Sequence, residues 1–195
     1  MSHKDVFNRI YSNDLWRHGS GAGSTEKNTV SYRWFIQNFI RSNNILSVVD
    51  IGCGDWQFSR LIDWGHTKYL GLDVSDVVLA NTTKFSRPGI EFREMDALTD
   101  PLPTAELAIV KDVLQHWGND DILNFIPKLS AFRMALITNS FHPAGLQDKN
   151  KDIPTGGWRT VDLAAEPFKL KGQYVYWIMA GEPKMIFLWT ADRAG

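Results

Sequence analysis

Short apolar runs alternate with amphipathic stretches from residue 45 onward, and this alternation constrains the fold more than any other sequence feature. The runs cover residues 45–51, 68–74, 90–95, 107–110 and 134–138, and each reads as a buried β-strand. Three helices are expected between these strands. The residues that mark them are Phe58, Leu61 and Ile62 for the first, Val77, Val78 and Asn81 for the second, and Ile122, Phe125, Ile126 and Leu129 for the third, which Asn119 is expected to cap. Strands that alternate with helices form parallel βαβ units. The sequence therefore predicts a doubly wound α/β sheet.

The two ends of the chain complete this fold. Residues 174–179 and 184–190 flank a short Ala-Gly-Glu-Pro turn, which predicts an antiparallel hairpin. Near the N-terminus, apolar residues from Tyr32 to Ile40 share one helical face, and Ser24 or Thr25 is the expected cap, with Glu26 in the first turn. We expect a Rossmann-like, mostly parallel seven-stranded sheet with a C-terminal antiparallel hairpin and helices on both faces.

Length and composition exclude several classes of protein. The 195 residues suit a single domain, and a net charge of −1 provides no field for bulk nucleic-acid binding. The single cysteine, Cys53, excludes an internal disulfide and a cysteine-based zinc site. No apolar run approaches the roughly 20 residues of a membrane span, and the charged N-terminus is unlike a signal peptide. A cytoplasmic protein is expected.

The segment VVDIGCGDW, residues 48–56, carries the main functional signal. Asp50 ends the first predicted strand, and Gly52 and Gly54 flank Cys53 in the turn that follows, where glycine allows a ligand to approach the backbone. A dinucleotide fingerprint requires a third glycine where Gln57 stands. S-adenosylmethionine has no pyrophosphate, and its ammonium group favours a nearby carboxylate from Asp50 or Asp55. The turn therefore favours this sulfonium cofactor.

Two further acidic residues end the next two strands. Asp73 can accept hydrogen bonds from ribose hydroxyls, with Val74 packing on the adenine. Asp96 can accept from the adenine amino group, with the Ala97 N–H facing a ring nitrogen. Each feature alone can be a tight turn, an N-cap or a loop start. Their order and spacing favour an adenosyl ligand, with another nucleotide as the alternative.

Together these residues resemble the class I S-adenosylmethionine-dependent methyltransferases from about residue 19 to 190. The combination of GSGAGS, DIGCGDW, KDVLQHW and DIPTGGWR resembles a bacterial, often carbohydrate-associated group of them. The resemblance implies S-adenosylmethionine as cofactor and S-adenosylhomocysteine as product. It further implies cofactor contacts from the N-terminal segment and the fourth strand, namely Trp16, Gly21, Gly23, Ser24, Lys111 and Asp112. Trp56 replaces the usual third glycine of the first motif.

The pattern along the chain divides the single domain, residues 1–195, into four segments. Residues 1–42 are expected to form a helical cap with the glycine segment, and residues 45–141 the cofactor-binding core. Residues 142–172 would form a long acceptor-side loop, because loops of this length inside a domain are usually functional. Residues 173–190 would form the hairpin.

On the acceptor side, Asp112 and His116 lie four positions apart and share a face if that stretch is helical. Asp112 could then orient His116 as the base that removes a hydroxyl proton during methyl transfer. Alternatively His116 only packs against the cofactor, since alignment of the reacting atoms can supply much of the rate. The predicted catalytic residues are His116 and Asp112.

Other candidates for acceptor binding follow the fifth strand and lie in the long loop: Asn139, Phe141, His142, Asp152, Trp158 and Arg159. A tryptophan can stack on a sugar or planar ring, and Arg159 can bind a carboxylate or phosphate. These residues could instead anchor the loop. The spacing of Asp112, His116 and His142 matches no metal site, and we predict no required metal.

Three functions remain open. The first is an enzyme that methylates oxygen on a small-molecule acceptor such as a sugar, with nitrogen as an alternative atom. The second is an RNA methyltransferase, which the neutral charge and the lack of an Asn-Pro-Pro-Tyr-like tetrad disfavour. The third is a noncatalytic S-adenosylmethionine-binding module, which the intact glycine turn and strand-end aspartates disfavour.

Overall fold

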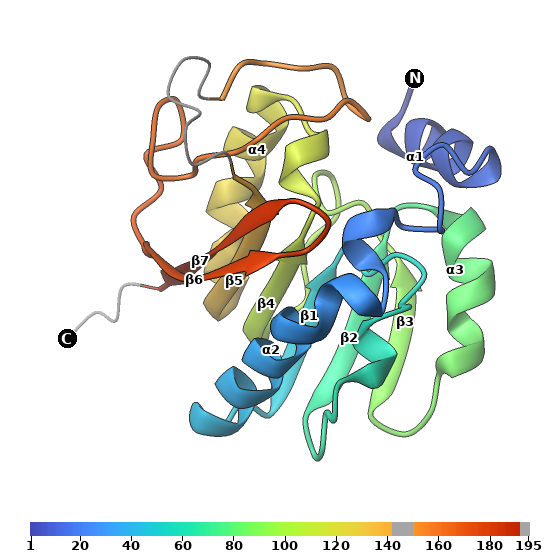
Figure 1. Ribbon diagram of the computed structural model, residues 1–195, viewed down its shortest axis with the longest axis vertical. Coiled ribbons are helices and arrows are strands. Elements are labelled where there is room, and N and C mark those ends of the chain that lie inside the picture. Colours follow the sequence, from blue (N-terminus) through green and yellow to red (C-terminus); the bar gives the residue numbers. More distant parts are fainter. Residues whose placement is uncertain (142–149, 192–195) are drawn as a thin grey trace.

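The computed structural model contains one seven-stranded mixed sheet (Figure 1) and describes residues 1–141 and 150–191. The strands are β1 (Ser47–Ile51), β2 (Lys68–Asp73), β3 (Ile90–Glu94), β4 (Ala105–Lys111), β5 (Phe132–Ser140), β6 (Gln173–Met179) and β7 (Pro183–Thr190). Their order is β3-β2-β1-β4-β5-β7-β6, with β1 to β5 parallel and β7 antiparallel to both of its neighbours. The predicted sheet and its C-terminal hairpin are confirmed.

Helices cover both faces of this sheet, as predicted (Figure 1). The helices are α1 (His3–Ser12), α2 (Val30–Ser42), α3 (Asp76–Thr82) and α4 (Asn119–Phe125), with 3-10 turns η1 (Ala22–Ser24), η2 (Lys27–Thr29), η3 (Ser59–Leu61), η4 (Thr83–Phe85), η5 (Leu114–His116) and η6 (Ile126–Ala131). Tyr32 and Ile36 of α2 pack with Val48 on one face, while Ile122 of α4 packs with Val49 on the other. Successive β1 side chains thus point to opposite layers, as strand geometry requires. None of the described helices is long and apolar enough to cross a membrane.

The prediction of a helix around Phe58, Leu61 and Ile62 was wrong, because only the single turn η3 forms there. The Ser59 carbonyl accepts from the Ile62 N–H and from the Trp64 indole N–H at 2.9 Å. The Asp63 N–H, which a continued α-helix would direct to that carbonyl, donates instead to the Gln37 side chain at 3.0 Å. Tertiary hydrogen bonds therefore replace the helical ones.

The predicted helix caps were also wrong. Ser24 and Thr25 belong to a separate 3-10 turn and its end, and α2 begins only at Val30, with no side-chain cap from Thr29. Asn119 is the first residue of α4 rather than its cap, and its backbone N–H donates to Asp152 at 2.7 Å. The apolar pattern through Leu129 is divided, because Pro127 has no N–H and the chain continues as η6.

Candidate active site

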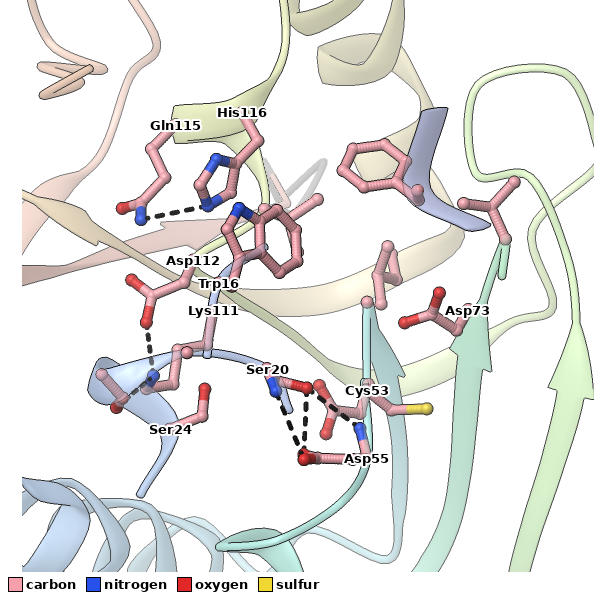
Figure 2. Close-up of a pocket in the computed structure, with 18 of the residues that line it drawn as sticks. Trp16, Ser20, Ser24, Cys53, Asp55, Asp73, Lys111, Asp112, Gln115 and His116 are labelled. Atoms are coloured by element: carbon pink, nitrogen blue, oxygen red, sulfur yellow. Dashed lines mark hydrogen bonds and ion pairs between the residues drawn. The ribbon is translucent and has the colours of Figure 1, made fainter. Parts of the chain in front are cut away.

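A cavity of about 400 Å³ lies at the carboxyl ends of β1, β2 and β4, between α1 and the β6–β7 turn. Open α/β sheets bind ligands at this edge. Figure 2 shows several of its residues. Of the residues proposed from sequence, the lining includes Trp16, Gly21, Gly23, Ser24, Asp50, Gly52, Cys53, Asp73, Val74, Asp96, Ala97, Lys111, Asp112, His116 and Trp158. Side chains distant in the sequence are therefore brought to one cavity.

Five proposed residues among those described do not line this cavity, namely Gly54, Asn139, Phe141, Asp152 and Arg159, and His142 lies outside the described residues. Gly54 supports the cavity from behind, with its N–H donating to Asp73 at 3.0 Å. Asn139 is buried within β5, and its side-chain oxygen has no hydrogen-bond partner within the described structure. Arg159 is considered with the loop below.

Asp50 is the penultimate residue of β1 and is almost fully buried beside the glycine turn. Its carboxylate accepts a 2.5 Å hydrogen bond from the Tyr69 hydroxyl. Burial raises the pKa of Asp50 to about 7, although Tyr69 and Lys111 act in the opposite direction. The neighbouring Gly52 has φ of +73°, a conformation that glycine adopts readily.

Asp73 and Asp96 end β2 and follow β3 at the same edge. The Asp73 carboxylate accepts from the backbone N–H of Ser75 at 2.9 Å and of Gly54 at 3.0 Å. Burial raises its pKa to about 6, partly offset by these N–H donors. Asp96 accepts from the Leu98 N–H at 2.9 Å. Each carboxylate keeps further acceptor capacity toward the cavity.

Asp55 has a different role from Asp50. Its carboxylate accepts from the Ser20 hydroxyl at 2.9 Å and from the Ser20 backbone N–H at 3.3 Å, while the Asp55 N–H donates to Ser20 Oγ (Figure 2). Asp55 therefore fastens the glycine segment to the glycine turn.

A buried ion cluster closes the end of the cavity nearest the hairpin. Lys184 of β7 donates to Asp112 at 2.7 Å and to Glu182 at 3.0 Å, and Lys111 donates to the other Asp112 oxygen and to the Gly23 carbonyl. Burial would raise the pKa of Asp112, but the two lysines hold it at about 2. Asp112 is thus a permanent anion with φ of +58°.

The prediction that Asp112 and His116 share one helical face was wrong. The stretch is not an α-helix, because Asp112 has positive φ and only the 3-10 turn η5 follows. The Asp112 carboxylate bonds to lysines, whereas His116 Nδ1 lies 2.7 Å from the Gly157 carbonyl oxygen. A catalytic role for either residue stays a prediction.

The Gly157 contact determines the tautomer of the neutral His116 ring. A carbonyl oxygen only accepts, so Nδ1 must carry the proton and Nε2 keeps its lone pair in the neutral ring. Burial lowers the pKa of His116 below its ordinary value, which favours that neutral ring. The Trp16 ring lies over the imidazole, with centroids 4.6 Å apart (Figure 2).

The described part of the long loop, residues 150–172, is fastened to η5 and α4 by Arg159. The buried guanidinium donates to the Asn119 side chain and to the carbonyls of Lys151 and Trp117. Arg159 therefore anchors the loop and is not placed to bind an acceptor, and neither Asp152 nor Phe141 lines the cavity. Among the loop candidates that the structure describes, only Trp158, which is half exposed, reaches the cavity.

Several lining residues were missed by the sequence reasoning: His3, Phe7, Tyr11, Ser20, Gln115, Trp117, Glu182 and Lys184. The first three lie on α1, which crosses the carboxyl edge of the sheet. Lys4 of this helix pairs with Asp76 and Glu94, and His3 pairs with Asp121 at 3.2 Å. The amphipathic pattern of α1 was a usable signal, whereas nothing local distinguishes Lys184.

The charge of the lining suits a cation. Six carboxylates (Asp50, Asp55, Asp73, Asp96, Asp112 and Glu182) and two lysines face the cavity. The two lysines are held by the ion cluster, so the remaining carboxylates leave a net negative surface. A sulfonium ligand with an ammonium group and ribose hydroxyls fits these residues. Within the described residues, no cluster of histidine, cysteine and carboxylate groups could hold a metal ion.

Sheet order, glycine turn and strand-end aspartates together define a class I S-adenosylmethionine-dependent methyltransferase. The model of one family, described as an O-methyltransferase domain, matches residues 2–136. The chain belongs to this O-methyltransferase domain family and is an enzyme that uses S-adenosylmethionine. No curated protein matches the chain in sequence.

Solved structures share the fold at low sequence identity. Magnesium protoporphyrin IX methyltransferase from Synechocystis with bound S-adenosylhomocysteine has a TM-score of 0.67 and 16% identity, covering 95% of this chain and 96% of that one. Human N-acetylserotonin methyltransferase has a TM-score of 0.60 and 17% identity, covering 96% and 59%. An O-methyltransferase family 2 protein from Planctomyces limnophilus in complex with apigenin has a TM-score of 0.58 and 14% identity, covering 83% and 62%.

Proposed function

We propose that this enzyme methylates an oxygen atom of a small molecule that has an apolar or sugar-like face. One observation carries the proposal: the acidic cavity continues into a side lined by rings, namely His3, Phe7, Trp16, His116, Trp117 and Trp158. Rings of this kind stack on planar groups and on the apolar faces of sugars. The cavity has the size of a small-molecule site rather than of a nucleic-acid groove.

The strand-end carboxylates would hold the cofactor. Asp50 is assigned to the ammonium group, Asp73 to the ribose hydroxyls, and Asp96 with Ala97 to the adenine edge. When bound, the cofactor supplies an electrophilic methyl group on a positively charged sulfur. The glycine segment, Gly21 to Ser24, and Trp16 would close over its amino-acid end.

His116 is assigned as the base for the acceptor. Its Nε2 lone pair is free because Nδ1 donates to Gly157, and burial keeps the ring neutral. The proton of an acceptor hydroxyl would pass to Nε2 as the oxygen approaches the methyl carbon. Asp112 would act at a distance, by holding Lys111 and the β4 turn in place.

We expect the purified enzyme to transfer a labelled methyl group to a hydroxylated aromatic compound or sugar in a screen that also contains amines and RNA. His116→Ala should lower kcat by roughly 100-fold or more, because general-base catalysis contributes about that much. The exposed His66→Ala is the matched control and should keep full activity. Exclusive labelling of RNA would disprove the small-molecule assignment.

The pH dependence of the same reaction follows from the lowered pKa of His116. Burial and Lys184 lower this pKa, while Gly157, Asp112 and Glu182 raise it, and the net value lies below 6.5. At saturating cofactor, kcat should therefore be constant above about pH 7.5 and fall in acid, as the imidazole becomes protonated. A kcat that still rises between pH 7.5 and 9 would argue against His116 as the base.

The glycine turn provides a stringent test of the cofactor site. A Cβ at Gly52 would clash with Val113, whereas a Cβ at Gly89, which also has positive φ, would meet no heavy atom within 4 Å. Both alanine variants carry backbone strain of about 1–2 kcal/mol. We expect Gly52→Ala alone to weaken S-adenosylhomocysteine binding at least tenfold in calorimetry, since Val113 lines the cavity. Equal losses in both variants would contradict this.

A further inference from the structure

Gln115 lies beside His116 in η5, and its side chain is not explained by the roles assigned so far. It is 3% exposed, and it lines the cavity. Its side-chain oxygen Oε1 accepts from the Ser140 backbone N–H at 2.8 Å, and Ser140 Oγ lies 2.9 Å away. An amide NH2 facing that backbone N–H would be repelled. The orientation of the Gln115 amide is therefore fixed, with its NH2 group on the other side.

The NH2 group of Gln115 points toward His116. Nε2 of Gln115 lies 3.5 Å from Nε2 of His116 (Figure 2). This distance is longer than a good N–H hydrogen bond. Since His116 Nδ1 donates to Gly157, its Nε2 is an acceptor. The cavity thus presents one donor and one acceptor side by side, and neither is saturated by the other.

We propose that Gln115 is a substrate-binding residue which, together with His116, selects a neutral hydroxyl group as the methyl acceptor over a carboxylate or an amine. The inference rests on the proposed function and names the acceptor group of that site. A hydroxyl oxygen placed roughly 2.9 Å from both nitrogens accepts from Gln115 and donates to His116. One hydroxyl group thus satisfies the Gln115 donor and the His116 acceptor at the same time.

The lone pairs and protons of the hydroxyl, amine and carboxylate groups explain why a hydroxyl is selected as the methyl acceptor. A hydroxyl oxygen has two lone pairs, so one accepts from Gln115 while the other forms the bond to the methyl carbon. The sulfur–methyl electron pair remains on sulfur, and the hydroxyl proton passes to His116 Nε2. A neutral amine has a single lone pair, which the Gln115 donor would occupy. A carboxylate has no proton to donate and faces the Nε2 lone pair.

The first test observes the hydrogen bonds directly, without relying on turnover. The probes are phenol, benzoate and aniline, added to the S-adenosylhomocysteine complex of 15N-histidine-labelled protein at pH 7.5. We expect His116, assigned by loss of its signals in His116→Asn, to be protonated only at Nδ1. Phenol and aniline, which each carry a proton to donate, should shift the Nε2 resonance, and benzoate should not; aniline is rejected only at methyl transfer, because Gln115 occupies its single lone pair. A proton on Nε2, no response to phenol, or an equal response to benzoate overturns the proposal.

The second test removes the donor. Gln115→Glu keeps the shape and one oxygen for Ser140 but turns a carboxylate oxygen toward His116, and Gln115→Met is a neutral variant without a donor. Both should weaken phenol binding at least tenfold while S-adenosylhomocysteine affinity stays within twofold of wild type, which also verifies folding. Gln173→Glu, on the exposed start of β6, makes the same chemical change as a control. Unchanged phenol binding in Gln115→Met overturns the proposal.

Turnover separates failure of this inference from failure of the proposed function. Acceptors of one carbon skeleton that differ only in a hydroxyl, carboxyl or amino group are compared in the methyl-transfer assay. Labelling of the hydroxyl compound alone supports the inference. Labelling of the acid or the amine alone contradicts it, yet leaves small-molecule methylation intact. Labelling of RNA alone contradicts the proposed function.

Discussion

Asp50→Asn should weaken cofactor binding about 100-fold and, at the same time, raise the melting temperature of the free protein at pH 8. The affinity loss is expected because a buried carboxylate beside a bound ammonium group contributes a strong charge-assisted interaction. The gain in stability is expected because a carboxylate with a pKa of about 7 is ionised at pH 8 inside the protein, where its charge is unfavourable. Calorimetry with S-adenosylmethionine and thermal unfolding measure the two effects.

The sign of the stability effect depends on pH. The pKa of Asp50 is raised from 3.8 to about 7 in the folded protein, so the folded state binds more protons than the unfolded state between these values. The contribution of Asp50 to stability is therefore full below pH 3.8 and is lost as pH rises to 7. The gain from Asp50→Asn should be clear at pH 8 and small at pH 5.

Proton release gives an independent readout for Asp50. An ammonium group beside this carboxylate lowers its pKa, so binding at pH 7 should release protons, whereas at pH 9 Asp50 is already ionised. Calorimetry in buffers of different ionisation enthalpy measures this release. Asp63→Asn, at an exposed carboxylate paired with Arg41, is the matched control and should change neither affinity nor release. Wild-type binding without proton release at pH 7 would contradict the assignment of Asp50.

Lys184→Met is expected to destabilise the protein by about 3 kcal/mol, because removing one partner of a buried ion pair leaves the other charge without compensation. Lys184 is 1% exposed and holds Asp112 at 2.7 Å. Asp112 would keep only Lys111 as a cationic partner. Urea unfolding monitored by circular dichroism measures the change in the free energy of unfolding.

The control for Lys184 is a lysine with equivalent partners in solvent. Lys4 bridges Asp76 and Glu94 with 37% of its side chain exposed, and Lys4→Met should change the free energy of unfolding far less than Lys184→Met does. Combining Lys184→Met with Asp112→Asn should cost less than the sum of the single changes, since the neutral side chain no longer needs a cation. Equal effects of Lys184→Met and Lys4→Met would show that the ion cluster contributes little.

The strands were predictable because their signal is local. A run such as residues 68–74 is too apolar to remain in solvent and too short for a helix, and it forms β2 with nearly the expected bounds. The strand-end positions of Asp50, Asp73 and Asp96 follow, since parallel strands bring their carboxyl ends to one edge. The fold and most of the cavity could therefore be predicted from the order of elements.

The remaining parts of the site depend on contacts between distant segments. Arg159 was assigned to the acceptor on its chemistry, but the carbonyls of Lys151 and Trp117 and the side chain of Asn119 use its donors. Gln115 gives no signal in the sequence, because its orientation depends on Ser140, 25 residues later. Tertiary hydrogen bonds of this kind have no periodicity from which to predict them.

The insertion of β7 between β5 and β6 has a consequence for biosynthesis. A nascent chain acquires both turn glycines and all three strand-end aspartates long before residue 184 leaves the ribosome, since translation proceeds at about 5–20 residues per second. During that interval Asp112 lacks its second cation, and the β5 edge has no neighbour. The last strand to be synthesised thus supplies the second cation at the hairpin end of the cavity. A polypeptide limited to residues 2–136 would contain the family's signature without that cation or the β7 neighbour of β5.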